Sequence, residues 1–215
     1  MRDSIQNVVD FLYEAKLTIA TSTISESDNF VSWHPTRKGI PFLRSDDDID
    51  VDQYISWIDA GHYTCILFDG SLLQLSYSID GRQISGHRLA FIPCPWLLDM
   101  NYLDEGFSLQ EILEIHSSNA VRMKSAVRFD LDISAAKRGH PASHLTFNSN
   151  DCRIACLAPI TPLRFVDFIF KNFYAFYWSR HRSYFSTARS SHLAIPVIGD
   201  DERDDIHISW NPYAA

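Results

Sequence analysis

The most continuous apolar pattern in the chain lies between Thr161 and Trp178. Thr161 can cap a first turn with its hydroxyl group, Pro162 suits the first helical position, and neither glycine nor a further proline interrupts the segment. Apolar and aromatic residues recur there at helical spacing, at Phe165, Val166, Phe168, Ile169, Phe170, Phe173, Tyr174, Phe176 and Tyr177. So wide an arc predicts a long core helix covered on more than one side. Because tyrosine and tryptophan favour interfaces, part of this surface could instead bind a partner.

Two amphipathic helices are predicted elsewhere from their start signals. The first follows a cap at Asp3 or Ser4 and has an apolar stripe at Ile5, Val8, Val9, Leu12 and Leu17. Another begins after Ser108, which forms a capping box with Glu111, and turns Leu109, Ile112 and Leu113 inward.

An acidic run leads into a third helix, which is predicted to end near Gly61. The run consists of Asp46, Asp47, Asp48, Asp50 and Asp52. Carboxylates stabilise the N-terminus of a helix. We therefore interpret the run as helix capping and solvated surface in preference to a metal site.

The clearest strand signal is an antiparallel meander of three strands. Apolar residues run from Tyr63 to Phe68, and alternation of apolar and polar residues follows in 71–79 and 82–92. The Asp69-Gly70 and Asp80-Gly81 pairs between these segments are strong hairpin signals. Alternation recurs in 127–133, 144–148 and 206–210, whereas residues 18–48 predict loops with one short strand at 31–33.

Taken in order, these elements predict an α+β fold with a mainly antiparallel β-sheet. The sheet is expected to pack against the long aromatic-rich helix and the further amphipathic helices. We expect residues 1–215 to form a single domain, with a less regular N-terminal part over 1–60 and a sheet-and-helix core over 61–210.

Composition places this fold in a reducing cytosol. The four cysteines lack the usual zinc or redox spacing, so free thiols are expected, and no apolar run is long enough to span a membrane. The net charge of −8 opposes broad electrostatic binding to nucleic acid or anionic lipid.

One segment departs from this acidic balance. Lys171, Arg180, Arg182 and Arg189 are cations with no acid between them. Their ordinary interpretation is a cationic helix end that complements the helix dipole, and the alternative is a local site for nucleic acid through Arg180, Arg182 and Arg189.

Candidate chemistry lies on the polar side of the later strands. In three strands, side chains that can bind a proton, a metal or a phosphate point away from the apolar face: Arg128, Asp130, Asp132, His144, Thr146 and His207. If these strands are neighbours, the face suits a divalent metal or acid–base work on a phosphodiester, with Arg128 steadying the charge and His140 closing over the site. The alternatives are a solvated face, stabilised by Arg–Asp pairs, and a polar recognition surface. The sequence predicts no required cofactor.

A series of motifs resembles a known family. They are HRLAFIP at 87–93, RFDLD at 128–132, HPASHLT at 140–146, CRI at 152–154 and PLRFVDFIFKNFY at 162–174. In order and spacing they resemble a family of bacterial proteins known as a domain of unknown function, over about residues 60–210. The resemblance implies no established activity, and it suggests a small cargo protein of a defence or toxin–antitoxin cassette.

Two hypotheses of different classes follow. The first is a non-enzymatic interaction subunit that binds a partner protein of the same operon, or nucleic acid, through the aromatic helix and the basic segment. The second is a nuclease that uses Asp130, Asp132, His144 and His207, with Arg128 at the phosphate.

Overall fold

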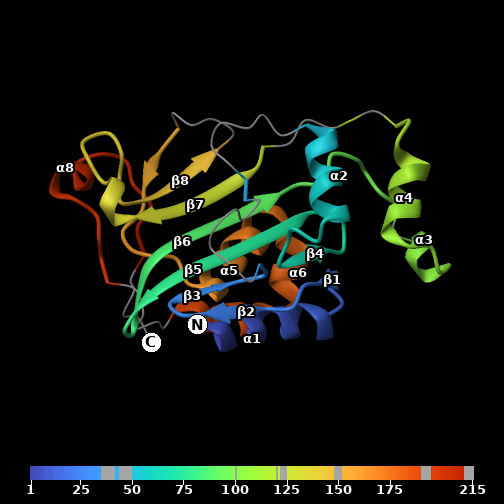
Figure 1. Ribbon diagram of the computed structural model, residues 1–215, viewed down its shortest axis with the longest axis horizontal. Coiled ribbons are helices and arrows are strands. Elements are labelled where there is room, and N and C mark those ends of the chain that lie inside the picture. Colours follow the sequence, from blue (N-terminus) through green and yellow to red (C-terminus); the bar gives the residue numbers. More distant parts are fainter. Residues whose placement is uncertain are drawn as a thin grey trace.

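The computed structural model describes residues 1–34, 42–43, 50–99, 101–119, 121, 125–147, 152–189 and 195–210. Within these residues, nine strands form one sheet (Figure 1). The strands are β1 Thr18–Thr21, β2 Ser25–Ser27, β3 Phe30–Ser32, β4 Cys65–Leu67, β5 Leu72–Asp80, β6 Gln83–Ile92, β7 Val127–Asp132, β8 Ser143–Phe147 and β9 Ile154–Ala155. The helices are α1 Arg2–Glu14, α2 Val51–Asp59, α3 Asn101–Asp104, α4 Leu109–His116, α5 Pro162–Phe173, α6 Ala175–Arg180, α7 Arg182–Phe185 and α8 Asp200–Arg203, with the 3-10 helices η1 Ile133–Ala135 and η2 Ser186–Arg189.

The predicted meander forms the centre of this sheet. β4, β5 and β6 pair antiparallel in that order. The sheet is extended from β6 by β7, β8 and β9, and each of these pairs is also antiparallel. Gly81, in the turn between β5 and β6, has a φ of +59°, a backbone conformation that glycine adopts without steric cost. The mainly antiparallel α+β fold expected from the alternation is therefore confirmed.

The N-terminal region is more regular than predicted. β1 pairs with β4, and β3 pairs with β2 and with β5, although this region was expected to contain only one short strand. The strands are three or four residues long, too short for alternation to identify them, and they form because β4 and β5 offer free edges. At the other end of the chain, the predicted strand over 206–210 is wrong. Ile208 makes only a single parallel bridge to Cys156, and Ile206 is 95% exposed.

The capping role predicted for the acidic run is confirmed at Asp50, and the predicted capping box at Ser108 is confirmed. The Asp50 carboxylate accepts a hydrogen bond from Gln53 N, and Ser108 and Glu111 bond reciprocally in a capping box. The acids Asp46, Asp47 and Asp48 lie outside the described residues. α1 begins at Arg2, so the caps expected at Asp3 or Ser4 are wrong. Its buried residues are the first four of the predicted stripe, and Leu17 is buried but lies beyond the helix.

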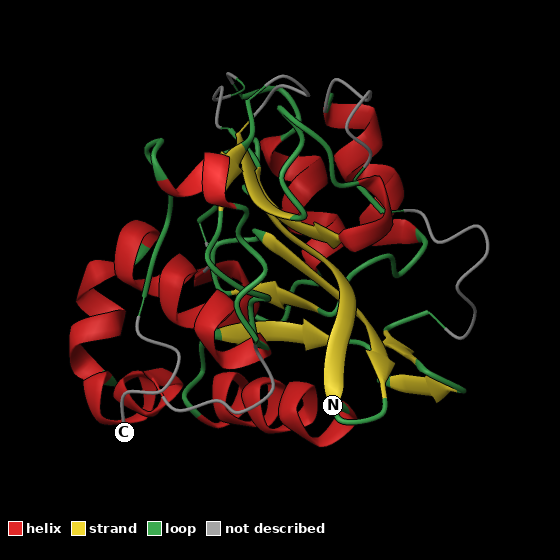
Figure 2. Ribbon diagram, turned by 90° about the vertical axis from the view of Figure 1, so that its left-hand side faces the viewer, coloured by secondary structure: helices red, strands yellow, loops and turns green. Residues whose placement is uncertain are grey.

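The first face of the sheet is covered by α1, α5, α6 and α7, and Figure 2 shows helices on both sides of the strands. Phe165, Val166, Ile169 and Phe170 of α5 have no exposed surface. Each large apolar side chain buried in this way stabilises the fold by about 1.5–3 kcal/mol, which makes α5 a major part of the core.

The predicted single long helix is in fact two helices, separated at Tyr174. Tyr174 has φ −135° and ψ 50°, outside the helical region, so α5 ends at Phe173 and α6 starts at Ala175. Thr161 precedes α5 but makes no side-chain cap bond, contrary to prediction. Phe173 and Phe176, expected in the buried arc, are 44% and 70% exposed.

The second face carries its own apolar cluster at one end, under α2 and α4. This cluster includes Tyr54, Trp57, Leu72, Ile92, Trp96 and Leu113. Toward the other end of β5 to β8 the same face becomes polar, because the alternation places Gln74, Ser76, Arg128 and His144 there. These four side chains are buried, so this part of the sheet is covered and not solvated.

Within the described residues, no helix has the length and apolar character needed to cross a bilayer. None of the four cysteines is in a disulfide bond, and burial raises the pKa of Cys65 and of Cys156 to about 12. These two thiols are therefore protonated and unreactive at neutral pH.

A buried histidine joins the sheet to the segment before α5. His87 accepts a hydrogen bond from Ile160 N at 3.0 Å through Nε2, and its Nδ1 lies 3.3 Å from Phe129 O, to which it donates in the neutral form. Burial lowers the pKa of His87 from 6.5 to about 3. The neutral imidazole is thus part of the folded structure.

This histidine makes stability depend on pH. Because the pKa is lower in the folded state, the unfolded chain binds more protons between pH 6.5 and 3, and stability is lost as the pH falls through that window. We expect His87 to contribute a loss of about 2 kcal/mol in the free energy of unfolding between about pH 7 and about pH 5. Urea denaturation at several pH values measures the loss. His87→Gln keeps an acceptor for Ile160 N without titrating, so its loss should be smaller; equal losses in both proteins would contradict the assignment.

Candidate functional site

Strand register brings three of the predicted site residues together. Asp130 of β7 lies directly opposite Arg88 of β6 and His144 of β8, and Arg128 lies opposite Thr146. All five therefore share the second face of the sheet. We call Arg128, Asp130, His144 and Thr146 the polar cluster.

A buried ion pair forms the centre of the polar cluster. Arg128 Nε donates to Asp130 Oδ2 at 2.5 Å, and the two side chains are only 10% and 16% exposed. Arg128 Nη1 also lies 3.5 Å from Leu43 O, and Gln74 Oε1 accepts from Leu43 N at 3.2 Å. Residues 42 and 43 thus cover this part of the sheet and are held there by polar side chains.

His144 lies beside this pair as a neutral imidazole. Its Nδ1 donates to Pro141 O at 2.9 Å, and its Nε2 lies 3.8 Å from Asp130 Oδ2, too far for a direct hydrogen bond. Burial lowers the pKa of His144, and the charges of His140 and Arg153 act in the same direction, against the carbonyl of Pro141 and the carboxylate of Asp130. A neutral imidazole beside a carboxylate can act as a general base, but His144 is only 3% exposed.

Some buried polar atoms, one of them in the polar cluster, have no hydrogen-bond partner in the described structure. Thr146 Oγ1, Ser32 Oγ and His140 Nδ1 are buried and have no hydrogen-bond partner among the described residues. The His140 ring lies 5.1 Å from the His144 ring, between centroids. No group of three metal-binding side chains occurs in the described part of the chain.

The other two predicted site residues lie in other environments. Asp132, at the end of β7, accepts hydrogen bonds from Ser134 N, Ser134 Oγ and Ala135 N, and so caps η1. The Ser134 hydroxyl, ahead of the backbone donors, lowers the pKa of Asp132. His207 bonds to Asp205 O through Nδ1 at 3.0 Å, and it lies in no strand.

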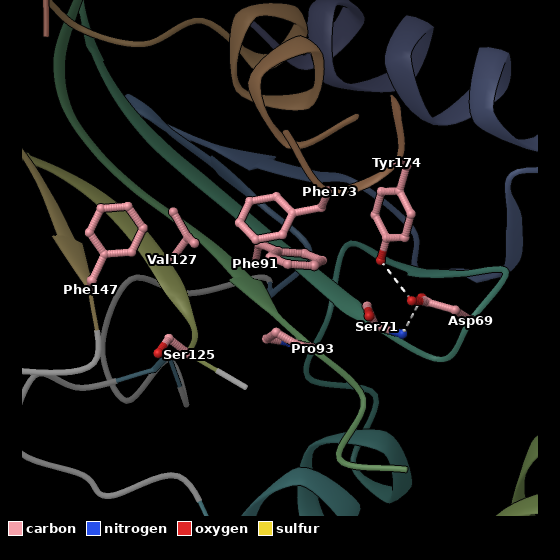
Figure 3. A pocket seen from close by; sticks show the side chains of 9 residues that line it. All are labelled: Asp69, Ser71, Phe91, Pro93, Ser125, Val127, Phe147, Phe173 and Tyr174. Carbon is pink, nitrogen blue, oxygen red and sulfur yellow. Dashed lines mark hydrogen bonds between the residues drawn. The ribbon is translucent and has the colours of Figure 1, made fainter. Parts of the chain in front are cut away.

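A second candidate site, on the first face, was not predicted. A cavity of about 290 Å³ lies below the junction of α5 and α6 (Figure 3). Its apolar lining consists of Phe91, Pro93, Val127, Phe147, Phe173 and Tyr174, and its polar lining of Asp69, Ser71 and Ser125. Alternation places Phe91, Val127 and Phe147 on one face of adjacent strands, but the cavity depends on the helix break at Tyr174, which the sequence does not signal.

A third feature is an exposed surface at the end of α5 and on α6 and α7. We call Lys171, Phe173, Phe176, Arg180 and Arg182 the aromatic–cationic surface; all five are exposed. Lys171 Nζ and Arg182 Cζ lie 5.6 and 5.9 Å from the centre of the Trp178 ring, within cation–π distance. The structure does not describe the side chain of Arg189, the fourth cation of the predicted basic segment.

Comparison with known proteins gives a family and no activity. No curated protein and no solved structure matches the chain. A family model described as "Uncharacterized conserved protein (DUF2290)" matches residues 14–210, which include all the strands and α2 to α8. The expected membership of a family of unknown function is confirmed, and the match extends further toward the N-terminus than the motifs did. The chain belongs to the DUF2290 family of uncharacterized conserved proteins.

Proposed function

We propose that this protein is a non-enzymatic interaction subunit that binds a partner protein through its aromatic–cationic surface. The observation that supports this most strongly is the exposure of Phe176, 70%, and Phe173, 44%, on helices whose other aromatic residues are buried or half-buried. Exposed aromatic side chains are enriched at protein interfaces relative to the rest of the surface.

The charges around these rings indicate the chemistry of the partner. Lys171, Arg180 and Arg182 form no ion pair with any carboxylate in the described residues. Arg180 follows Phe176 by four residues, so the two side chains share one face of α6. A partner with acidic side chains around an apolar centre would complement this face. Nucleic acid is a weaker fit, because the net charge of −8 repels a polyanion.

The partner is proposed to be encoded beside this protein, in a defence or toxin–antitoxin type cassette. We expect Phe176→Ala to weaken the complex at least about 30-fold, because truncating an aromatic anchor at the centre of an interface typically removes 2 kcal/mol or more. Affinity is measured by calorimetry with the purified products of neighbouring genes.

Tyr13→Ala provides a matched control, since Tyr13 is 69% exposed and lies on α1. It should leave the affinity unchanged. Equal effects of the two substitutions, or a chain that binds none of the neighbouring proteins, would refute the proposal. If the chain binds nucleic acid but no protein, and Arg180→Glu abolishes that binding, the partner is a polyanion and not a protein.

A second candidate function is a phosphodiester hydrolase, favoured by the 3.8 Å separation of His144 Nε2 and Asp130 Oδ2. It requires the cover formed by residues 42 and 43 to move, because the polar cluster is buried. A cleavage assay on RNA and DNA, with and without divalent metal, decides between the two candidates. If the wild type cleaves a nucleic acid and Asp130→Asn abolishes this cleavage, the protein is a hydrolase. The interaction-subunit proposal expects no cleavage by either protein.

A further inference from the structure

The cavity below the α5–α6 junction is built by elements that are distant in sequence. Its floor is formed by strands β6, β7 and β8, which contribute Phe91, Val127 and Phe147, and its roof by Phe173 and Tyr174 (Figure 3). The Phe91 and Phe173 rings lie 4.9 Å apart between centroids. Because Tyr174 leaves the helical conformation, its ring lies beside the cavity and packs on Phe91 and on Phe170.

One end of the cavity carries a carboxylate. Asp69 Oδ1 accepts from Ser71 N at 3.0 Å, and Oδ2 accepts from the Tyr174 hydroxyl at 2.9 Å. Each carboxylate oxygen can accept a further hydrogen bond. Asp69 is half-buried and forms no ion pair with any described cation.

Tyr174 contacts the Asp69 carboxylate as a neutral hydrogen-bond donor. Burial, with the neighbouring Asp69 charge, raises the pKa of Tyr174 well above 10.0, so its hydroxyl stays protonated and remains a donor. Within the described part of the chain, the Asp69 carboxylate is therefore contacted by neutral hydrogen-bond donors and by no cation. Phe147 and Val127 lie at the opposite, apolar end (Figure 3).

We propose that this cavity binds a small organic cation, an amine carried on an apolar body. The ammonium group would lie at Asp69 beside the Tyr174 ring, whose face attracts cations, and the apolar body would lie between Phe91 and Phe173 and extend toward Phe147. A cavity of about 290 Å³ is at the lower limit for ligand pockets, which sets the ligand below drug size. Phe173 belongs both to the roof of this cavity and to the aromatic–cationic surface, but the inference is argued from the cavity and from Asp69 and does not require a partner protein.

The test uses the full chain and three probes that share a phenyl ring and differ in the terminal group. We expect phenethylamine to bind saturably and at least about tenfold more tightly than phenethyl alcohol, because a charge-assisted hydrogen bond is worth more than a neutral one. Phenylacetate should not bind, since its carboxylate would face Asp69. Binding is followed by calorimetry and by chemical-shift changes in the Phe and Tyr resonances.

Two variants locate the site. Asp69→Asn keeps an acceptor for Ser71 N. It should weaken the binding of phenethylamine at least about tenfold and leave the affinity for phenethyl alcohol unchanged. Ser125→Phe, at an exposed position on the cavity lining, should block both without disturbing a buried polar group. Asp59→Asn removes the same charge from an exposed site on α2 and should change nothing. Absence of saturable amine binding, equal binding of amine and alcohol, or equal effects of Asp69→Asn and Asp59→Asn would overturn the proposal.

Discussion

Replacing Phe170 by alanine is expected to lower the free energy of unfolding by about 3–5 kcal/mol. Phe170 has no exposed surface, and its ring packs on Phe185 and on Tyr174, with 5.3 Å between centroids in both contacts. It therefore connects α5 with α7 and with the helix break. Removing the ring loses its burial and leaves a cavity that these neighbours can fill only partly. Chemical denaturation followed by circular dichroism measures the loss.

Phe176→Ala is the matched control for this prediction. The same ring is removed six residues later, from a side chain that is 70% exposed, so the loss should be within about 0.5 kcal/mol. Similar losses at the two positions would show that α6 packs in the way the sequence pattern first predicted, and that Phe176 is not available to a partner.

The contrast between Phe170 and Phe176 also shows what the sequence could predict about the central helix. Helical spacing correctly identified Phe165, Ile169 and Phe170 as core residues, because periodicity reports which side chains share a face. It failed at Tyr174, where no glycine or proline marks the end of α5. The helix ends there while the tyrosine bonds to Asp69, which is 105 residues away in sequence, and periodicity cannot detect such a contact.

The sheet was more predictable than the helices. Two Asp-Gly pairs, an apolar run and the alternation that follows it predicted the meander, and alternation also placed Arg128, Asp130 and His144 on one face. Alternation cannot show whether a face is solvated. Residues 42 and 43 cover the polar cluster through bonds to Gln74 and Arg128, and nothing in the spacing of either segment indicates that they meet.

The structure places Asp132 and His207 in surroundings that the alternation did not predict, for local reasons. Asp132 lies on the predicted face, but it is the last residue of β7 and its carboxylate caps the turn that follows. His207 was assigned by alternation to a strand of five residues, and a single bridge at Ile208 replaces that strand. A short alternating segment is thus a weak predictor of a β-strand when the sequence does not indicate which strand it pairs with.

Asp130→Ala is expected to lower the free energy of unfolding by about 3–5 kcal/mol, since it leaves the Arg128 guanidinium buried without its counter-charge. Arg128 is 10% exposed and its described partners are Asp130 and the carbonyl of Leu43, so water can replace the lost carboxylate only if the cover opens. The measurement is urea denaturation at neutral pH. Asp132→Ala, on the same strand and face, removes an exposed capping carboxylate and should cost only about 1 kcal/mol.

A double variant distinguishes a structural ion pair from a site retained for chemistry. Arg128→Met combined with Asp130→Leu removes both charges and keeps an apolar volume, and such replacements are often neutral or stabilising. We expect the double variant to recover most of the stability lost in Asp130→Ala. If it also keeps its affinity for the partner protein, the ion pair serves the fold, which agrees with a binding function located on the aromatic–cationic surface. If it folds well but loses the only measurable activity of the protein, the polar cluster is the functional site and the interaction proposal is wrong.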